Sequence, residues 1–267
     1  MPFAASATAK LYYEVQGTGP EVILLIQGLG GHASEWGEPF LAPLAERFRV
    51  ARMDNRGIGQ SESSVTQWTM LDMANDAVAV LDALGAQRAN VLGTSMGGMI
   101  AQQVALAHRA RVAKLVLMST TAGGASAVPP WPEAVALFSP PQGMSLADQR
   151  RWSLRVITGP GFAEANAQKI EDMVQLRLRV PTKGRVFQSQ LEAIFNSDRS
   201  EAVRQLDLPT LVIHGTEDSL VPVGNGKELA ARIPGAKLEL LEGCGHMPHL
   251  EMPARCAKLI LDFLAGG

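Results

Sequence analysis

Hydrophobic and polar positions follow two alternating patterns along the chain. Short runs are apolar at almost every position, which is typical of strands covered on both faces of a sheet. Longer stretches repeat apolar residues every three or four positions, which indicates helices with one buried face. The predicted strands are residues 22–26, 49–53, 90–92, 114–118, 210–214 and 237–241, preceded by an edge strand at 11–15. The helices between and after them are predicted at 34–47, 70–84, 98–107, 226–232 and 253–264.

This alternation predicts an α/β fold with a mostly parallel sheet and helices on both faces. The rhythm breaks between residues 121 and 205, where proline and glycine pairs are frequent and no strand is predicted. Within that segment we expect helices at 145–157, 163–178 and 183–196. We therefore divide the chain into a core domain, residues 1–121 and 206–267, and a helical lid of residues 122–205 over the carboxyl ends of the strands.

Composition narrows the class of protein. The 267 residues are 46% hydrophobic and 19% charged, which suits one large soluble domain with an insertion. The formal charge of −2 and the lack of a basic tract give no electrostatic basis for binding nucleic acid or an anionic membrane surface. We find no secretory signal, and no apolar run approaches the ~20 residues of a membrane span. Two cysteines, Cys244 and Cys256, predict reduced thiols in a cytoplasmic protein.

The strongest chemical motif is the G-x-S-x-G pattern at residues 93–97, centred on Ser95. A predicted strand precedes it and a predicted helix follows it, which is the context of a nucleophile elbow. The chain must turn within a few residues to present the serine hydroxyl, and side chains at positions 93 and 97 would collide there, so glycine is needed at both. The N-terminus of the following helix would favour negative charge beside the serine. We interpret Ser95 as a catalytic nucleophile.

A serine hydroxyl needs a general base, and that base needs an acid to hold its tautomer. Asp218 and His246 each follow a predicted strand after the insertion, and the order Ser95, Asp218, His246 is that of α/β-hydrolase triads. We assign Asp218 as the acid and His246 as the base, with Glu217 and His249 as the alternatives for the two roles. All three predicted sites fall at the carboxyl ends of strands, where sites gather in parallel sheets.

An oxyanion requires two preorganised donors. One is expected from the backbone N–H of Met96, directly after the nucleophile. The second is expected from Leu29, in the glycine-rich turn after the strand at 22–26. The same turn also fits the dinucleotide pattern G-x-G-x-x-A, with Asp54 placed for a ribose. That alternative leaves the elbow unexplained, and we expect Asp54 and Arg56 to fix a turn as a structural pair.

These motifs together resemble the α/β-hydrolase superfamily, and within it the small esterase and lactonase branch that includes 3-oxoadipate enol-lactonases. They span most of the chain in family order: Gln27-Gly28-Leu29-Gly30, Asp54-x-Arg56-Gly57-x-Gly59-x-Ser61, Gly93-Thr94-Ser95-Met96-Gly97-Gly98, His214-Gly215-x-x-Asp218-x-x-Val221-Pro222 and Gly245-His246-x-Pro248-x-x-Glu251. The resemblance implies an eight-stranded, mostly parallel sheet with a helical cap after the sixth strand. It also implies Ser95, Asp218 and His246 as the triad and Leu29 and Met96 as the oxyanion donors.

One residue departs from the family pattern. Members commonly carry histidine before the glycine of the oxyanion turn, where this chain has Gln27. Serine at position 95 also differs from the carboxylate nucleophile of the epoxide hydrolases and haloalkane dehalogenases of the same superfamily.

The expected activity is hydrolysis of a small, partly hydrophobic carboxylic ester or lactone through an acyl-enzyme, with no cofactor and no metal. Carbon–carbon bond hydrolysis of dienone acids and cofactor-free perhydrolysis use the same triad and are the alternative chemistries. A hydrolase-fold sensor that binds a small ligand without turnover is a further alternative. The expected partner is a small-molecule substrate, without nucleic acid or membrane, and the sequence leaves monomer and homo-oligomer open.

Overall fold

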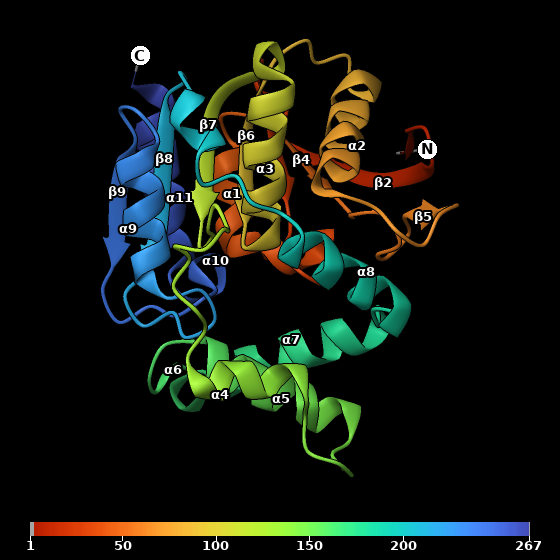
Figure 1. Cartoon of the computed structure of the whole chain (residues 1–267), viewed down its shortest axis with the longest axis vertical. Coiled ribbons are helices and arrows are strands. Elements are labelled where there is room, and N and C mark those ends of the chain that lie inside the picture. The colour runs from red at the N-terminus through yellow and green to blue at the C-terminus, as the bar shows by residue number, and fades with distance from the viewer. Residues whose placement is uncertain (1–2, 267) are drawn as a thin grey trace.

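The computed structural model describes residues 3–266 and shows a central sheet with helices on both faces (Figure 1). Its strands are β1 Phe3–Ala5, β2 Ala9–Gln16, β3 Val22–Ile26, β4 Arg49–Met53, β5 Glu62–Ser63, β6 Ala89–Thr94, β7 Val112–Met118, β8 Thr210–Gly215 and β9 Lys237–Leu241. Its α-helices are α1 Glu38–Ala45, α2 Met70–Ala83, α3 Met96–Ala107, α4 Pro132–Val135, α5 Leu146–Ile157, α6 Phe162–Ala165, α7 Ala167–Arg179, α8 Gly184–Phe195, α9 Val223–Arg232, α10 Pro248–Glu251 and α11 Pro253–Ala265. Short 3-10 helices occupy Ala33–Trp36, Arg109–Arg111, Ala136–Phe138 and Ala202–Gln205.

The sheet order is β1-β2-β4-β3-β6-β7-β8-β9, with β5 paired to β2 off this path. Neighbours from β4 to β9 are parallel, whereas β2 runs antiparallel to β1, β4 and β5. The predicted mostly parallel sheet is confirmed, and the path holds the eight strands expected. The sequence analysis missed β1 and β5, because two or three residues are too few to show a hydrophobic period.

Each face of the sheet has its own apolar core. On β3, Leu24 and Ile26 pack with residues of α2 and α3, whereas Ile23 and Leu25 pack with residues of α1 and α11. Successive strand residues point to opposite faces, so a strand buried on both sides is apolar throughout. This is why the continuous apolar runs predicted the inner strands correctly.

The predicted helices differ from the observed ones where a single residue interrupts the helical backbone. Gly37, with a φ of 69°, separates the 3-10 helix at Ala33–Trp36 from α1 within the helix expected at 34–47. Asn166, with a φ of −126° and a ψ of 42°, separates α6 from α7 within the helix expected at 163–178. Neither residue disturbs the apolar spacing, which is why the periodicity alone predicted continuous helices.

Helices α4 to α8 lie between β7 and β8 in the chain, and among residues 121–205 the structure contains no strand. Figure 1 shows α4, α5, α6 and α7 as a layer below the sheet, with α8 between that layer and α3. A separate apolar cluster holds the layer together, around Leu154, Met173 and Val174. The division into a core domain and a lid at residues 122–205 stays a prediction.

The inserted segment is seated on the loops that follow the strands. Thr182 Oγ1 donates to the carbonyl of Gly30 after β3 at 2.8 Å, and Ser219 Oγ after β8 donates to the carbonyl of Val156 at 2.7 Å. The backbone N–H of His246 after β9 donates to the carbonyl of Ile157. These bonds hold the insertion over the carboxyl ends of β3, β8 and β9.

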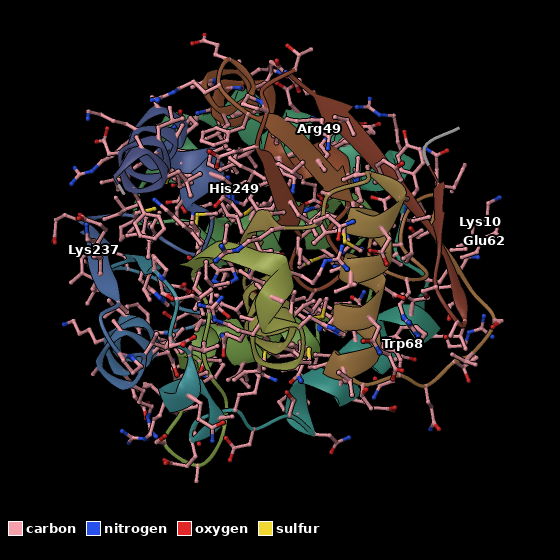
Figure 2. All side chains as sticks on the ribbon, turned by 90° about the horizontal axis from the view of Figure 1, so that it is seen from above. Lys10, Arg49, Glu62, Trp68, Lys237 and His249 are labelled. Carbon is pink, nitrogen blue, oxygen red and sulfur yellow. The ribbon has the colours of Figure 1, made fainter. Side chains whose placement is uncertain are left out.

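Figure 2 shows how the interior differs from the sheet edges. His249 lies inside the molecule, whereas Lys10 and Glu62 lie at one edge and Lys237 at the other.

The two cysteines are free thiols, as the sequence analysis expected. Both are buried, and burial raises the pKa of both, that of Cys256 to about 12. Within residues 3–266 no helix is long and apolar enough to cross a lipid bilayer.

Candidate active site

Ser95 forms the turn between β6 and α3 and has a strained backbone. Its φ of 55° and ψ of −125° lie outside the regions that residues with side chains normally adopt. Such a conformation costs about 1–3 kcal/mol and persists only where the surroundings impose it. Here the Ser95 N–H donates to the carbonyl of Met118 at 2.9 Å, and Thr120 Oγ1 donates to the carbonyl of Ser95 at 2.7 Å. Neighbouring β7 and the loop after it therefore hold the turn.

The two glycines of the motif are required by close backbone contacts. A Cβ on Gly93 would lie 2.0 Å from the carbonyl oxygen of Gly97. A Cβ on Gly97 would lie 2.1 Å from the carbonyl oxygen of Ile26 in β3. Both distances are far below van der Waals contact, so only glycine fits at either position. This confirms the steric reason inferred for the G-x-S-x-G spacing.

Asp218 and His246 come together from the loops after β8 and β9. Nδ1 of His246 lies 2.8 Å from Oδ2 and 3.0 Å from Oδ1 of Asp218, and both side chains are buried. The backbone N–H groups of Leu220 and Val221 donate to Oδ1 of the same carboxylate. Burial alone would raise the pKa of Asp218, but the neighbouring imidazoles of His246 and His214 hold that pKa below its ordinary value. Asp218 is therefore a carboxylate that can orient an imidazole.

Ser95 and His246 line the same cavity, which has a volume of about 180 Å³. Among residues 3–266, the structure contains no hydrogen bond between the Ser95 hydroxyl and the His246 ring. The fold therefore brings the candidate acid and base into direct contact. It places the serine and the base in the lining of one cavity. Such catalytic hydrogen bonds are often long in unliganded enzymes and tighten when substrate binds.

The alternatives for the acid and base occupy different surroundings. Glu217 is half-buried, and its carboxylate lies 3.5 Å from Thr216 Oγ1, away from the His246 ring nitrogens. The ring of His249 packs against Trp36 with centroids 5.0 Å apart, and neither ring nitrogen has a hydrogen-bond partner among the described residues. Burial lowers the pKa of His249 to about 4, so this imidazole is neutral near pH 7. Of the two candidate bases, His246 is thus the one that contacts Asp218.

His214 is a member of the site that the sequence analysis did not assign. Its Nε2 lies 2.7 Å from the carbonyl oxygen of Val221 and 3.3 Å from Oδ2 of Asp218. The carbonyl can only accept, so Nε2 carries the proton. The sequence holds only a weak signal for this role, namely that His214 lies four residues before the assigned acid, in β8.

The turn after β3 provides the second part of a possible oxyanion hole. Among the described residues, the backbone N–H groups of Leu29 and Met96 have no acceptor. A Cβ on Gly28 would lie 2.9 Å from Cβ of Ser95, so glycine lets this turn approach the serine closely. Gln27, the departure from the family pattern, accepts from the N–H of Gly28 through its own side-chain oxygen at 3.2 Å.

Asp54 and Arg56 do not form the structural pair that the sequence analysis expected. Asp54 accepts from the backbone N–H groups of Ala33 and Gln60, whereas Arg56 forms a buried ion pair with Asp76 at 2.6 Å. Each residue does fix local structure, but with its own partner. The carboxylate of Asp54 is therefore committed to the turn, which leaves no support for the dinucleotide interpretation.

A second cavity of about 300 Å³ meets the first at Ser95. It is lined mostly by apolar side chains, and Leu29, Phe138 and Leu220 line both cavities. Residues 3–266 contain no cluster of three or more His, Cys, Asp or Glu side chains that could hold a metal ion. The serine thus lies between two pockets, one that includes charged side chains in its lining and one without any.

Comparisons with known proteins agree with this geometry. Residues 21–253 match a family model described as the alpha/beta hydrolase fold. The chain is 31% identical to a 2-hydroxy-6-oxononadienedioate/2-hydroxy-6-oxononatrienedioate hydrolase of Pseudomonas putida, over 96% of this chain and 91% of that protein.

Two solved structures are similar along their whole length. An enol-lactonase from Burkholderia xenovorans superposes with a TM-score of 0.84 at 31% identity, covering 98% of this chain and 99% of that one. The esterase RhEst1 from Rhodococcus superposes with a TM-score of 0.83 at 28% identity, covering 100% and 99%. With its elbow, its sheet order and the family match over residues 21–253, this chain belongs to the α/β-hydrolase superfamily.

Proposed function

We propose that this hydrolase cleaves a small carboxylic ester or lactone through an acyl-enzyme. The observation that carries the proposal is the shared cavity, which is lined by both the strained Ser95 and the imidazole paired with Asp218. The similarity to an enol-lactonase and an esterase supports the same class of substrate.

In the proposed reaction the Ser95 hydroxyl attacks the substrate carbonyl carbon while Nε2 of His246 takes its proton. Nδ1 of the same ring keeps its proton toward Asp218, and the carboxylate stabilises the imidazolium that forms. His246 then returns the proton to the leaving alkoxide, which in a lactone stays attached to the acyl group. Water activated by His246 attacks the acyl-enzyme and releases the acid.

The negative charge on the carbonyl oxygen would be held by two backbone donors. Among residues 3–266, the N–H groups of Leu29 and Met96 are donors without an acceptor, one in the turn that approaches Ser95 and one directly after it in the chain. Met96 is also the first residue of α3, so the positive end of the helix dipole adds to the stabilisation. Removing one such donor typically costs about 10²–10³ in turnover.

Carbon–carbon bond hydrolysis is the second candidate, because the curated relative in Pseudomonas putida is a hydrolase of a dienedioate. The same serine, base and acid would serve that reaction. The apolar second cavity favours an ester or lactone with a hydrophobic part, and a substrate panel distinguishes the two chemistries.

A fluorophosphonate probe tests the nucleophile, and we expect it to label the wild type and to leave Ser95→Ala unlabelled. Labelling that persists in Ser95→Ala would overturn the proposal. The wild type should then hydrolyse aryl esters or lactones faster than vinylogous diketone acids, and the reverse order would favour carbon–carbon bond cleavage.

A further inference from the structure

The oxyanion turn after β3 is a β-turn of four residues, Gly28 to Gly31. The N–H of Gly31 donates to the carbonyl of Gly28 at 3.2 Å, and Gly30 has a positive φ of 69°, as the third residue of a type II turn requires. Leu29, whose N–H is the expected oxyanion donor, is the other central residue. Turns of types I and II differ mainly in the orientation of the central peptide, here the one between Leu29 and Gly30. The position of the donor therefore depends on what holds this peptide.

Residues outside the insertion hold the beginning of the turn. Asn55 Nδ2, on the loop after β4, donates to the carbonyl of Gln27 at 2.9 Å. The side-chain oxygen of Gln27 accepts from the N–H of Gly28 at 3.2 Å. Both bonds fix the peptide between Gln27 and Gly28, and neither of them reaches the central peptide of the turn.

The inserted segment holds the end of the turn through both polar backbone groups of Gly30. Gln190 Oε1, on α8, accepts from the Gly30 N–H at 2.8 Å, and Thr182 Oγ1, just before α8, donates to the Gly30 carbonyl at 2.8 Å. The N–H of Gly30 belongs to the central peptide, so its bond to Gln190 opposes rotation of that peptide.

The side chain of Gln190 is fully buried, and its Nε2 has no hydrogen-bond partner among residues 3–266. A backbone N–H can only donate, so the amide atom that faces Gly30 must be the oxygen. A buried amide nitrogen without a partner costs stability. The fold thus keeps this glutamine for its acceptor, which is the group that holds the turn.

Helix α8 has further contacts with the loops after β4 and β5, and it lies between the helical layer and α3 (Figure 1). Ser189 Oγ lies 2.5 Å from the carbonyl oxygen of Thr66, after β5. A Cβ on Gly57, after β4, would lie 2.9 Å from Cγ2 of Val186, so this side chain packs directly against the backbone there. These contacts fix the helix on which Gln190 lies, so its oxygen is a fixed point for the turn.

We propose that Gln190 and Thr182 are positioning residues for the oxyanion hole, which hold Gly30 so that the N–H of Leu29 points at the substrate carbonyl oxygen. The inference rests on the proposed function, because it concerns the negative charge that forms after the serine attacks. It gives the inserted segment a part in stabilising the transition state, in addition to covering the cavity. Such an interaction is made as charge develops, so its loss lowers kcat and leaves KM nearly unchanged.

Steady-state hydrolysis of 4-nitrophenyl butyrate tests the two contacts separately. Gln190→Met removes the amide oxygen from a side chain of similar shape, and Thr182→Val removes the hydroxyl. We expect each to lower kcat by about 10-fold, less than the ~10²–10³ of a lost donor, with KM within about twofold. Gln190→Glu keeps an acceptor and Thr182→Ser keeps the hydroxyl, so both should retain most of the turnover. Gln188→Met is the matched control, an exposed glutamine on the same helix, and it should change neither constant.

A pair of ketones separates positioning from general structure. Ser95 Oγ forms a bond to the carbonyl carbon of 1,1,1-trifluorooctan-2-one, the carbonyl oxygen takes the π electron pair as an oxyanion, and the serine proton passes to His246. Octan-2-one binds without this addition. In Gln190→Met and Thr182→Val the inhibition constant of the trifluoroketone should rise by the factor by which kcat/KM falls, and that of octan-2-one should stay within about twofold.

Unchanged kcat in both variants, with a wild type that is active and labelled by the fluorophosphonate, would overturn the inference and leave the proposed function standing. Equal weakening of both ketones would also overturn it, since that indicates a general loss of structure. If Gln190→Met does not fold, Thr182→Val decides the question, because Thr182 is only half-buried. If the wild type hydrolyses no ester or lactone and Ser95 is not labelled, the proposed function fails and the inference fails with it.

Discussion

Nε2 of His214 lies 3.3 Å from Oδ2 of Asp218, the same oxygen that lies 2.8 Å from Nδ1 of His246. Both His214 and Asp218 are fully buried. The carboxylate therefore accepts hydrogen bonds from the His246 imidazole and from the two backbone N–H groups of Leu220 and Val221, and the His214 imidazole lies beside it. Such a carboxylate stays ionised and has little freedom to rotate, which suits an acid that orients a catalytic base.

Asp218→Asn should fold normally and lose turnover by about 10⁴-fold, because an amide can present its N–H to Nδ1 and favour the wrong imidazole tautomer. Steady-state kinetics on an aryl ester measures the loss. Glu217→Gln is the neighbouring control and should retain turnover within about twofold. If Glu217→Gln lost more activity than Asp218→Asn, the acid would be Glu217.

His214→Gln should lower kcat by about 10-fold with little change in KM, since His214 contacts Asp218 and lies outside the substrate cavities. The measurement is kcat and KM on one ester, with His108→Gln as a control, because His108 caps the end of α3 opposite to Ser95 and bonds Asn75. A rise in KM with unchanged kcat would contradict a positioning role.

Gly97→Ala should destabilise the fold by about 3 kcal/mol or more, because the new Cβ would meet the carbonyl oxygen of Ile26 at 2.1 Å. Gly184→Ala is the matched control, since a Cβ there meets no atom within 4 Å and the residue begins helix α8. Urea unfolding followed by circular dichroism compares the two variants with the wild type. Equal stability of the variants would show that the elbow tolerates a side chain.

His249→Phe should flatten the pH dependence of stability between about pH 6.5 and 4. The pKa of His249 is lowered to about 4 in the folded protein, so the unfolded chain binds the proton first as pH falls. The wild type should therefore lose free energy of unfolding across this window, on the order of 3 kcal/mol, and regain it as pH rises. Phenylalanine has no proton to bind and can keep the aromatic contact with Trp36. Urea unfolding at several pH values measures this free energy. If it changed with pH in the same way for the wild type and for His249→Phe, the lowered pKa of His249 would be contradicted.

Much of the fold could be predicted because the relevant patterns are local. The inner strands are apolar at each position since both their faces are covered, and β3 and β4 begin and end at the predicted residues. The helix breaks at Gly37 and Asn166 could not be predicted in the same way, because they change backbone angles without changing the hydrophobic period.

The sequence by itself determined the α/β class, the elbow at Ser95 and the order of the candidate acid and base, since short motifs and periodicities encode them. Only the tertiary structure decided which side chains meet. It joined Asp218 to His246, placed His214 beside the same carboxylate and paired Arg56 with Asp76. The physical reason is that ion pairs and hydrogen bonds act over a few ångströms, whereas partners such as Asp218 and His246 lie 28 positions apart and are brought together only by packing of the sheet and its loops.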